Sequence, residues 1–512
     1  MFENSILGKI PAFVRLLCAI VANSAVYRGL SRAWHGILNA ARESVIFRSF
    51  FADNQIDGAM NTAWSVRLVQ GCINGIFSAL RKLYSKLADT LKGSVFGRFY
   101  NRVYRHHWSA SPAAWLGLFV LVMLAVPHDY WANTYGLLGV LALFFVWSAL
   151  VIAGKRDVFS LARPGVPFWV FAACFIPAVL RAPAVSDAIR VLIFFITAFA
   201  LYLLVVAETD DADKLRRLLG FLFLGIFFTA MFGFVQRVMG VSVDASLTDV
   251  ALNPNMPGRV FSTFENPNNY AELLVLTMPL CFVFCIGIKN RPAKVLSFVM
   301  LACIFGALLM TYSRSCWVSF ALAVAVFIFL YDKRLLPLAL VVGLAAIPLL
   351  PSSILDRILT IGSQNDTSNA YRVFIWDAVL QMIKWDWFTG VGLGPDNFKA
   401  VYTLYADPYA ITAPHSHMLY LELWVELGLT GLIAFFWLMF DLLRSAVRAA
   451  KRTAEPFLRY VLYACVSSFV GIAFSCIAEY IWFYPRVLLA FFLVAGILKA
   501  AVHICNKKEL PR

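Results

Sequence analysis

Charged side chains are scarce in this sequence of 512 residues. They make up 14% of it, against roughly 25% in soluble domains, while hydrophobic residues make up 61%. This shortage excludes an ordinary soluble protein and predicts an all-α polytopic membrane protein. Acidic residues are the scarcer sign, with 29 Asp and Glu beside 44 Lys and Arg. Because the basic residues lie mainly in short runs between apolar segments, they indicate membrane topology and not nucleic-acid binding.

Motifs that hold a metal or a nucleotide are also missing. Ten cysteines occur without a CxxC pair or a Cys/His metal spacing, so we interpret them as small packing residues. The sequence contains no P-loop and no dinucleotide fingerprint. We therefore expect neither a metal nor a cofactor. The first residues have a weak apolar core and no small-residue cleavage site, so we expect no cleavable signal peptide.

Residues 1–110 differ from the rest of the chain. They hold 14 of the Lys and Arg residues but only 5 of the Asp and Glu residues. No stretch reaches the roughly 20 apolar residues of a spanning helix. Apolar and basic residues instead mix at helical spacing, with one face made of Ile76, Leu80, Leu83 and Leu87, and Arg81, Lys82 and Lys86 between them. This pattern predicts basic amphipathic helices on the anionic cytoplasmic membrane surface, and a small soluble helical domain is the alternative.

About twelve apolar runs follow and predict as many transmembrane helices. They lie near 112–127, 131–153, 165–180, 187–207, 218–238, 269–288, 295–312, 315–331, 335–350, 418–443, 459–480 and 486–504. With a cytoplasmic N-terminus, the inner loops carry 20 basic residues and the outer segments 10. The positive-inside rule then puts both termini, including the tail 505–512, in the cytoplasm.

The largest predicted outer segment is the loop 351–417. A structureless loop of that length is uncommon, so we expect it to be functional and partly helical. Residues 370–385 have helical periodicity, and a short helix is predicted to start at Pro395. The glycine-rich stretch 390–394 between them suits unusual backbone angles.

At the end of this loop, His417 marks a sharp border between polar and apolar sequence. We expect it in the first turn of the helix that follows, where the helix dipole favours the neutral imidazole, able to act as a base. The alternative is an interfacial histidine with its polar edge in water. His415 is predicted to be a supporting or solvated residue. Glu422, about one turn further on, could orient a hydroxyl, pair with an arginine, or have a structural role.

Three arginines of the predicted outer segments are the main candidates for binding an anion. Arg259 and Arg372 lie in long loops, and Arg314 lies in a break of a few residues between two apolar runs. Guanidinium groups bind phosphate oxygens two at a time, so these side chains could form an anion site. The alternatives are solvated loop charges and, for Arg314, a side chain that snorkels to the interface. Arg486 is a weaker fourth candidate.

Four stretches together resemble the bacterial O-antigen ligase and O-antigen polymerase family. They are Arg259 to Asn268, Thr311 to Arg314, Tyr371 to Trp376 with 390–394, and the histidine motif of His417, Gly428 and Gly431. The similarity covers roughly residues 112–504, within a transmembrane region 111–504. Met418 departs from the pattern, because members usually have Asn, Ser or Gln there.

The resemblance implies a C-type glycosyltransferase that uses no metal. Its donor would be a glycan on undecaprenyl pyrophosphate, held by Arg259, Arg314 and Arg372 outside the cytoplasmic membrane. His417 would deprotonate a hydroxyl of a glycan, lipid or protein acceptor, with inversion at the anomeric carbon. A transporter of an anion or of a lipid-linked sugar remains the alternative, because about twelve spans also suit a carrier.

Overall fold

The computed structural model describes residues 32, 63–95, 98, 112–241, 258–359 and 367–509. This part of the chain is mainly helical and contains no strand. The first half comprises α5 (Trp64–Gly93), α7 (Pro112–Ala125), η1 (His128–Tyr130), α8 (Asn133–Ile152), α9 (Val166–Ala173), α10 (Phe175–Arg181), α11 (Val185–Glu208) and α12 (Ala212–Met239). The second half comprises α13 (Pro267–Gly287), α14 (Arg291–Met310), α15 (Arg314–Asp332), η3 (Lys333–Leu335), α16 (Leu336–Ala346), η4 (Ile347–Leu349), α17 (Ser352–Leu359), α18 (Thr367–Asp386), α19 (Pro395–Tyr402), η5 (Pro408–Ala410), α20 (Leu419–Arg452), α21 (Pro456–Ser475), η6 (Ile481–Phe483) and α22 (Pro485–Glu509).

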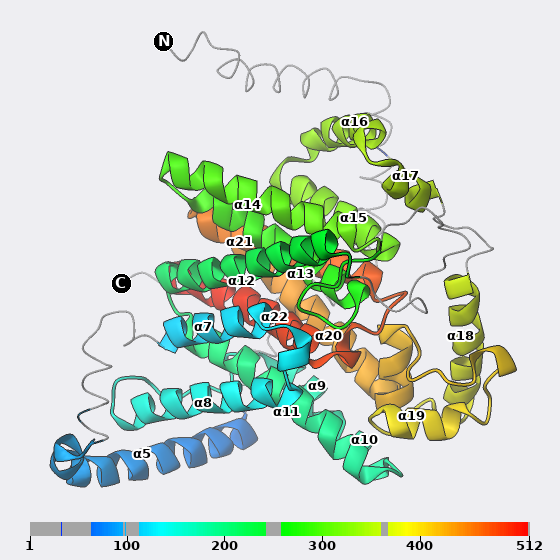
Figure 1. Ribbon diagram of the computed structural model, residues 1–512. Coiled ribbons are helices and arrows are strands. Elements are labelled where there is room, and N and C mark those ends of the chain that lie inside the picture. Colours follow the sequence, from blue (N-terminus) through cyan, green and yellow to red (C-terminus); the bar gives the residue numbers. More distant parts are fainter. Residues whose placement is uncertain are drawn as a thin grey trace, which may run out of the picture.

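The long apolar helices form one bundle, with α18 and α19 beyond one end of it (Figure 1). Local chemistry sets several helix starts. The Asp211 carboxylate accepts hydrogen bonds from the first backbone N–H groups of α12, and the Asn266 side chain does the same for α13. Helix α22 lies at the centre: nearly all its side chains from Val487 to Cys505 are buried, against α11, α20 and α21.

Each predicted apolar run coincides with one helix or two consecutive helices. Nine candidate spans in the described part are long and apolar enough to cross a membrane, and α15 continued through α16 is one of these. Two shorter apolar stretches, Pro112–Ala125 and Val166–Arg181, add to them. The number of about twelve crossings is therefore not confirmed, because length alone separates these short helices from spanning ones.

Prolines explain two of the short helices. Pro177 has no N–H and crowds the carbonyl four residues earlier, and α9 ends at that residue, Ala173. Pro337 lies in the first turn of α16, where proline is tolerated, and Pro348 follows the end of that helix. Although α16 is short, it brings the chain back to the end of the bundle where α15 begins.

Loop 351–417 is partly helical, and α18 and α19 occupy the segments where the sequence predicted helices. Its glycine-rich stretch docks on a break in α20 at Gly428, which has φ 71°. Across the break, the Val425 carbonyl accepts from the Val391 N–H at 2.7 Å and the Leu429 N–H donates to the Trp387 carbonyl at 2.9 Å. The two backbones touch, because a Cβ on Gly428 would lie 2.1 Å from the Phe388 oxygen. The loop thus satisfies the backbone groups that the kink releases.

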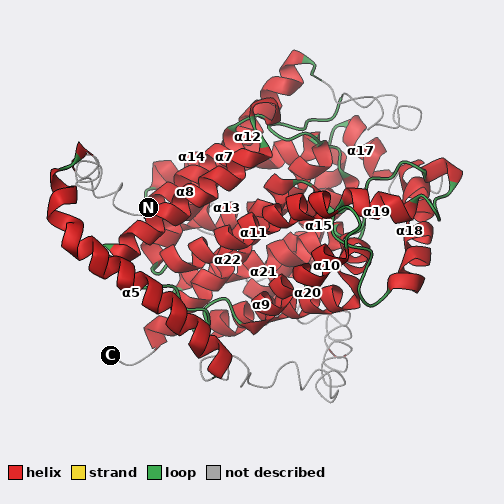
Figure 2. Ribbon diagram, turned by 90° about the horizontal axis from the view of Figure 1, so that it is seen from below, coloured by secondary structure: helices red, strands yellow, loops and turns green. Residues whose placement is uncertain are grey.

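Helix α5 is the longest described piece of residues 1–110. Gln70 and Arg81 of this helix hydrogen-bond the backbone at Phe159, Leu161 and Val151, near the end of α8. These two side chains are far apart on α5 but contact the same short segment, so α5 lies across that end of the bundle (Figure 2). Most of the other residues in 1–110, for which basic amphipathic helices were also predicted, lie outside the described residues.

Candidate active site

Glu479, in the loop between α21 and α22, is the centre of a polar cluster at one end of the bundle. Its Oε1 accepts hydrogen bonds from Arg372 Nη2 at 2.6 Å and from Asn268 Nδ2 at 2.9 Å. Its Oε2 lies 3.7 Å from Nδ1 of His417. Burial favours a raised pKa for Glu479, but the Arg372 guanidinium and the nearby histidines lower that pKa to about 2. The carboxylate is therefore ionised at neutral pH.

Arg259 reaches the same cluster from the segment before α13. Its Nε donates to the Thr311 carbonyl at 2.9 Å, and its Nη2 donates to Asn268 Oδ1. Burial lowers the pKa of Arg259 to about 10, Glu479 opposes this, and repulsion from Arg314 and Arg372 adds to it. At neutral pH the guanidinium is charged. The charges of Arg314 and Arg372 both act on Arg259, so the three guanidinium groups lie in the same region of the structure.

Arg314 is the first residue of α15, directly after a tight turn. Tyr312 in that turn has φ 52°, a conformation that costs free energy for a residue with a Cβ. Ser262 and His417 are the other two non-glycine residues with positive φ in the described part. Each of the three lies in a different motif of the predicted site, so backbone strain gathers where the motifs meet.

Arg372, on α18, has an unused donor. Its Nη2 binds Glu479, but its Nε is buried without a hydrogen-bond partner among the described residues. An unpaired donor on a buried guanidinium costs free energy that an incoming anion can recover. This side chain is the best placed of the three to gain from binding phosphate.

His417 is not in the first turn of a helix, contrary to the sequence prediction. Helix α20 begins at Leu419 with Met418 as its N-cap, and His417 precedes both with φ 52°. Because His417 precedes the helix, the predicted effect of the helix dipole on its ring does not apply. Its surroundings are instead Glu479 and Tyr371, whose ring centroid lies 6.1 Å away. The side chain is 24% exposed, so its ring is accessible to a substrate.

His415 supports the backbone of His417. Its Nδ1 accepts the His417 backbone N–H at 3.1 Å, and the two ring centroids lie 4.2 Å apart. Burial, with repulsion from His417, lowers the pKa of His415 to about 3, so the ring is neutral at neutral pH. His415 is only 6% exposed, so of the two predicted roles the solvated one is wrong.

Glu422 holds the loop that carries both histidines. Its Oε2 accepts the Ser416 N–H at 2.6 Å, while Trp376 Nε1 of α18 donates to the Ser416 carbonyl at 3.0 Å. Glu422 therefore pairs with the backbone of the loop and not with an arginine. Because Glu422 is part of α20, the orientation of this helix determines where the loop holds His417.

Arg486 lies apart from this cluster. Its guanidinium donates to the carbonyls of Val126 at 2.9 Å and Thr263 at 2.7 Å, and it stacks on the Phe264 ring at 4.6 Å. These contacts use its donors to join three segments of the chain. The structure thus gives Arg486 a structural role, and its predicted role in anion binding finds no support.

Three residues of the cluster were not among the predicted site residues. They are Glu479 in the loop before α22, Asn268 at the start of α13, and Glu272 within α13. Glu272 follows Asn268 by one turn of α13 and is buried, with Oε2 lacking a partner within the described ranges. The available signal was the cost of a carboxylate in an apolar helix, which implies a partner or a function.

The arrangement combines a base, cations and an orienting carboxylate. A carboxylate facing Nδ1 of a histidine favours the tautomer that leaves Nε2 free to accept a proton. Three guanidinium groups gather at the same place, and their positive charge favours an anionic ligand. The site can therefore activate a hydroxyl next to a bound anion.

Comparisons with known proteins identify one family. Residues 298–436 match a family model described as O-antigen ligase, and no curated protein matches the chain. The matched region contains Arg314, Arg372 and both histidines, whereas Arg259 and Glu479 lie outside it. Together with the nine apolar helices, the match indicates a multi-pass inner-membrane protein with glycan transfer of the ligase or polymerase type. Over residues 298–436, the chain is therefore similar to the O-antigen ligase family.

Proposed function

We propose that this protein transfers or polymerises a glycan from undecaprenyl pyrophosphate onto a hydroxyl acceptor, outside the cytoplasmic membrane and without a metal. The observation that carries the proposal is the meeting of His417 with three arginines around Glu479. A hydroxyl on another glycan is the acceptor that we favour, and a lipid or protein hydroxyl is the alternative. We propose no transport function, since the grouped charges lie at helix ends and not midway along the spans.

In the proposed reaction, the acceptor hydroxyl attacks the anomeric carbon as its proton moves to Nε2 of His417. The bond from the anomeric carbon to the pyrophosphate oxygen breaks on the opposite side, so the configuration inverts. The leaving pyrophosphate keeps the bonding electrons, and Arg259, Arg314 and Arg372 offset its growing charge. General-base catalysis contributes about 10²–10⁴-fold to such reactions.

Glu479 is expected to stabilise the protonated His417. Its 3.7 Å distance from Nδ1 is longer than a hydrogen bond, and such contacts often shorten when substrate binds. Pyrophosphate would compete with Glu479 for Arg372, which leaves the carboxylate free to turn fully towards the histidine. Met418 caps α20 through its backbone only, so the proposed base does not depend on an amide at that position.

The test is a set of alanine variants, His417→Ala and Arg314→Ala, in a strain whose surface glycan is followed as a gel ladder. We expect both to lose the ladder, by at least 100-fold for His417→Ala. His128→Ala and Arg181→Ala are matched controls on the same end of the bundle, and they should keep it. A normal ladder from His417→Ala, at normal protein level, refutes the proposed base. Accumulated single lipid-linked units would indicate a polymerase, and accumulated full-length lipid-linked chains a ligase.

A further inference from the structure

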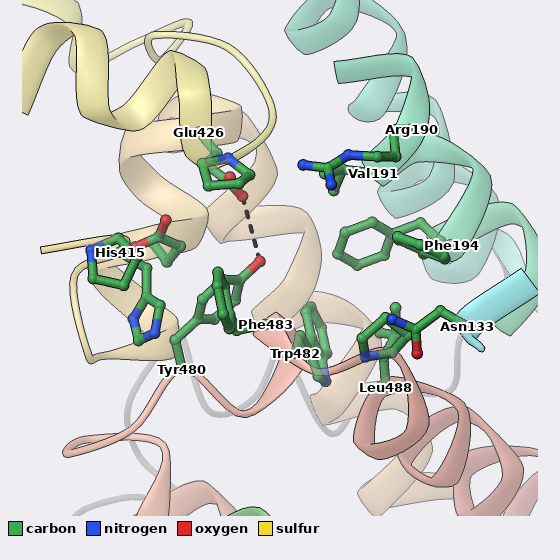
Figure 3. A pocket seen from close by; sticks show the side chains of 15 residues that line it. Asn133, Arg190, Val191, Phe194, His415, Glu426, Tyr480, Trp482, Phe483 and Leu488 are labelled. Carbon is green, nitrogen blue, oxygen red and sulfur yellow. Dashed lines mark hydrogen bonds between the residues drawn. The ribbon is translucent and has the colours of Figure 1, made fainter. Parts of the chain in front are cut away.

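A cavity of about 150 Å³ lies on the His415 side of the histidine loop. Its walls come from the starts of α8, α11, α19, α20 and α22, from the histidine loop and from the segment around η6. Figure 3 shows Arg190 and Phe194 of α11 on one wall, facing Glu426 and Tyr480 on the other. Arg259, Arg314 and Arg372 are not among the residues that line it. The cavity is therefore distinct from the proposed pyrophosphate site, although the two share the histidine loop.

Buried polar groups point to a hydroxyl-rich ligand. Glu422 and Glu426 both line the cavity, one helical turn apart, and are 1% and 3% exposed. Glu426 Oε1 accepts the Gly394 N–H at 2.8 Å, but its Oε2 has only a long contact of 3.5 Å to the Tyr480 hydroxyl. Acceptor capacity is left over in a buried place, where unmade hydrogen bonds are costly.

His415 supplies a donor to the same cavity. Because its Nδ1 accepts the His417 N–H, the proton of the neutral ring lies on Nε2. That Nε2 has no protein hydrogen-bond partner in the part of the chain that the structure describes. The cavity thus offers both acceptors and a donor, which is the mixture that hydroxyl groups need.

Aromatic rings complete the lining. Phe194, Trp482 and Phe483 border the cavity beside the carboxylates. Apolar C–H faces of a sugar pack on such rings while its hydroxyls bond the carboxylates. An acyl chain would bury these polar groups without hydrogen-bond partners. Arg190, which also lines the cavity, is paired with Asp187.

From these contacts we infer that the cavity binds one sugar residue of the acceptor. The inference rests on the proposed function and adds to it the acceptor class and its subsite. A cavity of this volume holds one six-membered ring, as an engineered cavity of the same size in another protein does for benzene. A sugar there would lie against His415, whose ring is 4.2 Å from the ring of His417. The next acceptor hydroxyl could then reach the proposed base.

Two variants test the subsite in the purified full-length protein in nanodiscs. Val191→Trp fills the cavity from α11, and Tyr480→Phe removes one hydroxyl at unchanged volume. Ile196→Trp, on an exposed position of the same helix, is the matched control. The donor is lipid-linked glycan extracted from cells lacking the protein, and the acceptor is oligosaccharide released from the host's surface glycan by mild acid. We expect the acceptor KM to rise at least tenfold in Val191→Trp and about threefold in Tyr480→Phe, with the donor KM unchanged.

Binding is measured beside transfer, so that the two proposals can fail separately. Quenching of tryptophan fluorescence reports binding of the same oligosaccharide to the wild type, to Tyr480→Phe and to the Ile196→Trp control. Weaker binding to Tyr480→Phe, with unchanged binding to the Ile196→Trp control, supports the subsite even if no transfer occurs. Absence of transfer by the wild type counts against the proposed function. An unchanged acceptor KM and unchanged binding in a folded Tyr480→Phe protein overturn the subsite. A rise in the donor KM alone also overturns it, because the cavity would then belong to the donor.

Discussion

His415 and His417 are close in sequence and lie in different surroundings. His417 has an accessible ring, while His415 is buried and its Nδ1 holds the backbone of its neighbour. Sequence spacing could not separate these roles, because both residues precede the same helix. The burial of His415 also makes the stability of the protein depend on pH.

The pH dependence has a definite sign. The pKa of His415 is about 3 in the folded protein, below the value of about 6.5 in an unfolded chain. Below pH 6.5, His415 binds a proton in the unfolded state but not in the folded state, so the stability falls as the pH falls towards 3. At pH 5 we expect a loss of about 2 kcal/mol relative to pH 7. His415→Asn keeps an acceptor for the His417 N–H and should remove this part of the slope. Thermal unfolding in detergent between pH 5 and pH 7.5 measures it, and equal slopes in both proteins would contradict the assignment.

At the scale of elements, the break in α20 positions the loop that carries α18 and Arg372. Gly428→Ala would place a Cβ 2.1 Å from the Phe388 oxygen, at a φ of 71°. We expect this variant to lose several kcal/mol of stability or to release the loop, and to lose transfer activity. Gly343→Ala on α16 is the control, because nothing lies within 4 Å of its added Cβ. Limited proteolysis of loop 351–417 distinguishes the two: Gly428→Ala should be cut faster and Gly343→Ala at the wild-type rate.

Helix α5 presents an apolar stripe outward, beyond the side that contacts α8. Val69, Ile76, Leu80, Leu83 and Leu87 are between 39% and 60% exposed and repeat at helical spacing. We expect this stripe to enter the lipid while Lys82 and Lys86 stay at the headgroups. A nitroxide label at position 83 in anionic nanodiscs should be accessible to oxygen, and one at position 82 to a water-soluble relaxation agent. Water accessibility at both positions would favour the soluble-domain alternative.

At the scale of the whole molecule, the charge bias predicts which end of the bundle faces out. The cluster around Glu479 lies at the end from which α18 and α19 project, and the basic loop after α20 lies at the other end (Figure 1). We expect a membrane-impermeant thiol reagent to label Tyr409→Cys in intact spheroplasts, because this residue is 83% exposed. Arg452→Cys should react only after lysis. The reverse pattern would put the proposed base inside the cell and end the proposal.

The amino-acid sequence alone predicted the helical class, the positions of nearly all long helices and the motifs that carry Arg259, Arg314, Arg372 and His417. These follow from local properties: apolar length, the side chains that cap helices, and residue types with few chemical uses. The helices in loop 351–417 were also predictable, since their periodicity is local. Charge counting gave an orientation that the structure leaves as a prediction.

Which polar residues meet depends on how the helices pack against one another. Glu479 and Asn268 are 211 positions apart, and their contact depends on how α13 packs against the end of α21. In the same packing, Arg486 lies apart from the site and His415 lies beside His417. Sequence patterns record what a residue needs within one helix, whereas burial and pairing between distant segments arise from the folded bundle. The role of a carboxylate or an arginine at a helix end could therefore be assigned only after the helices were placed.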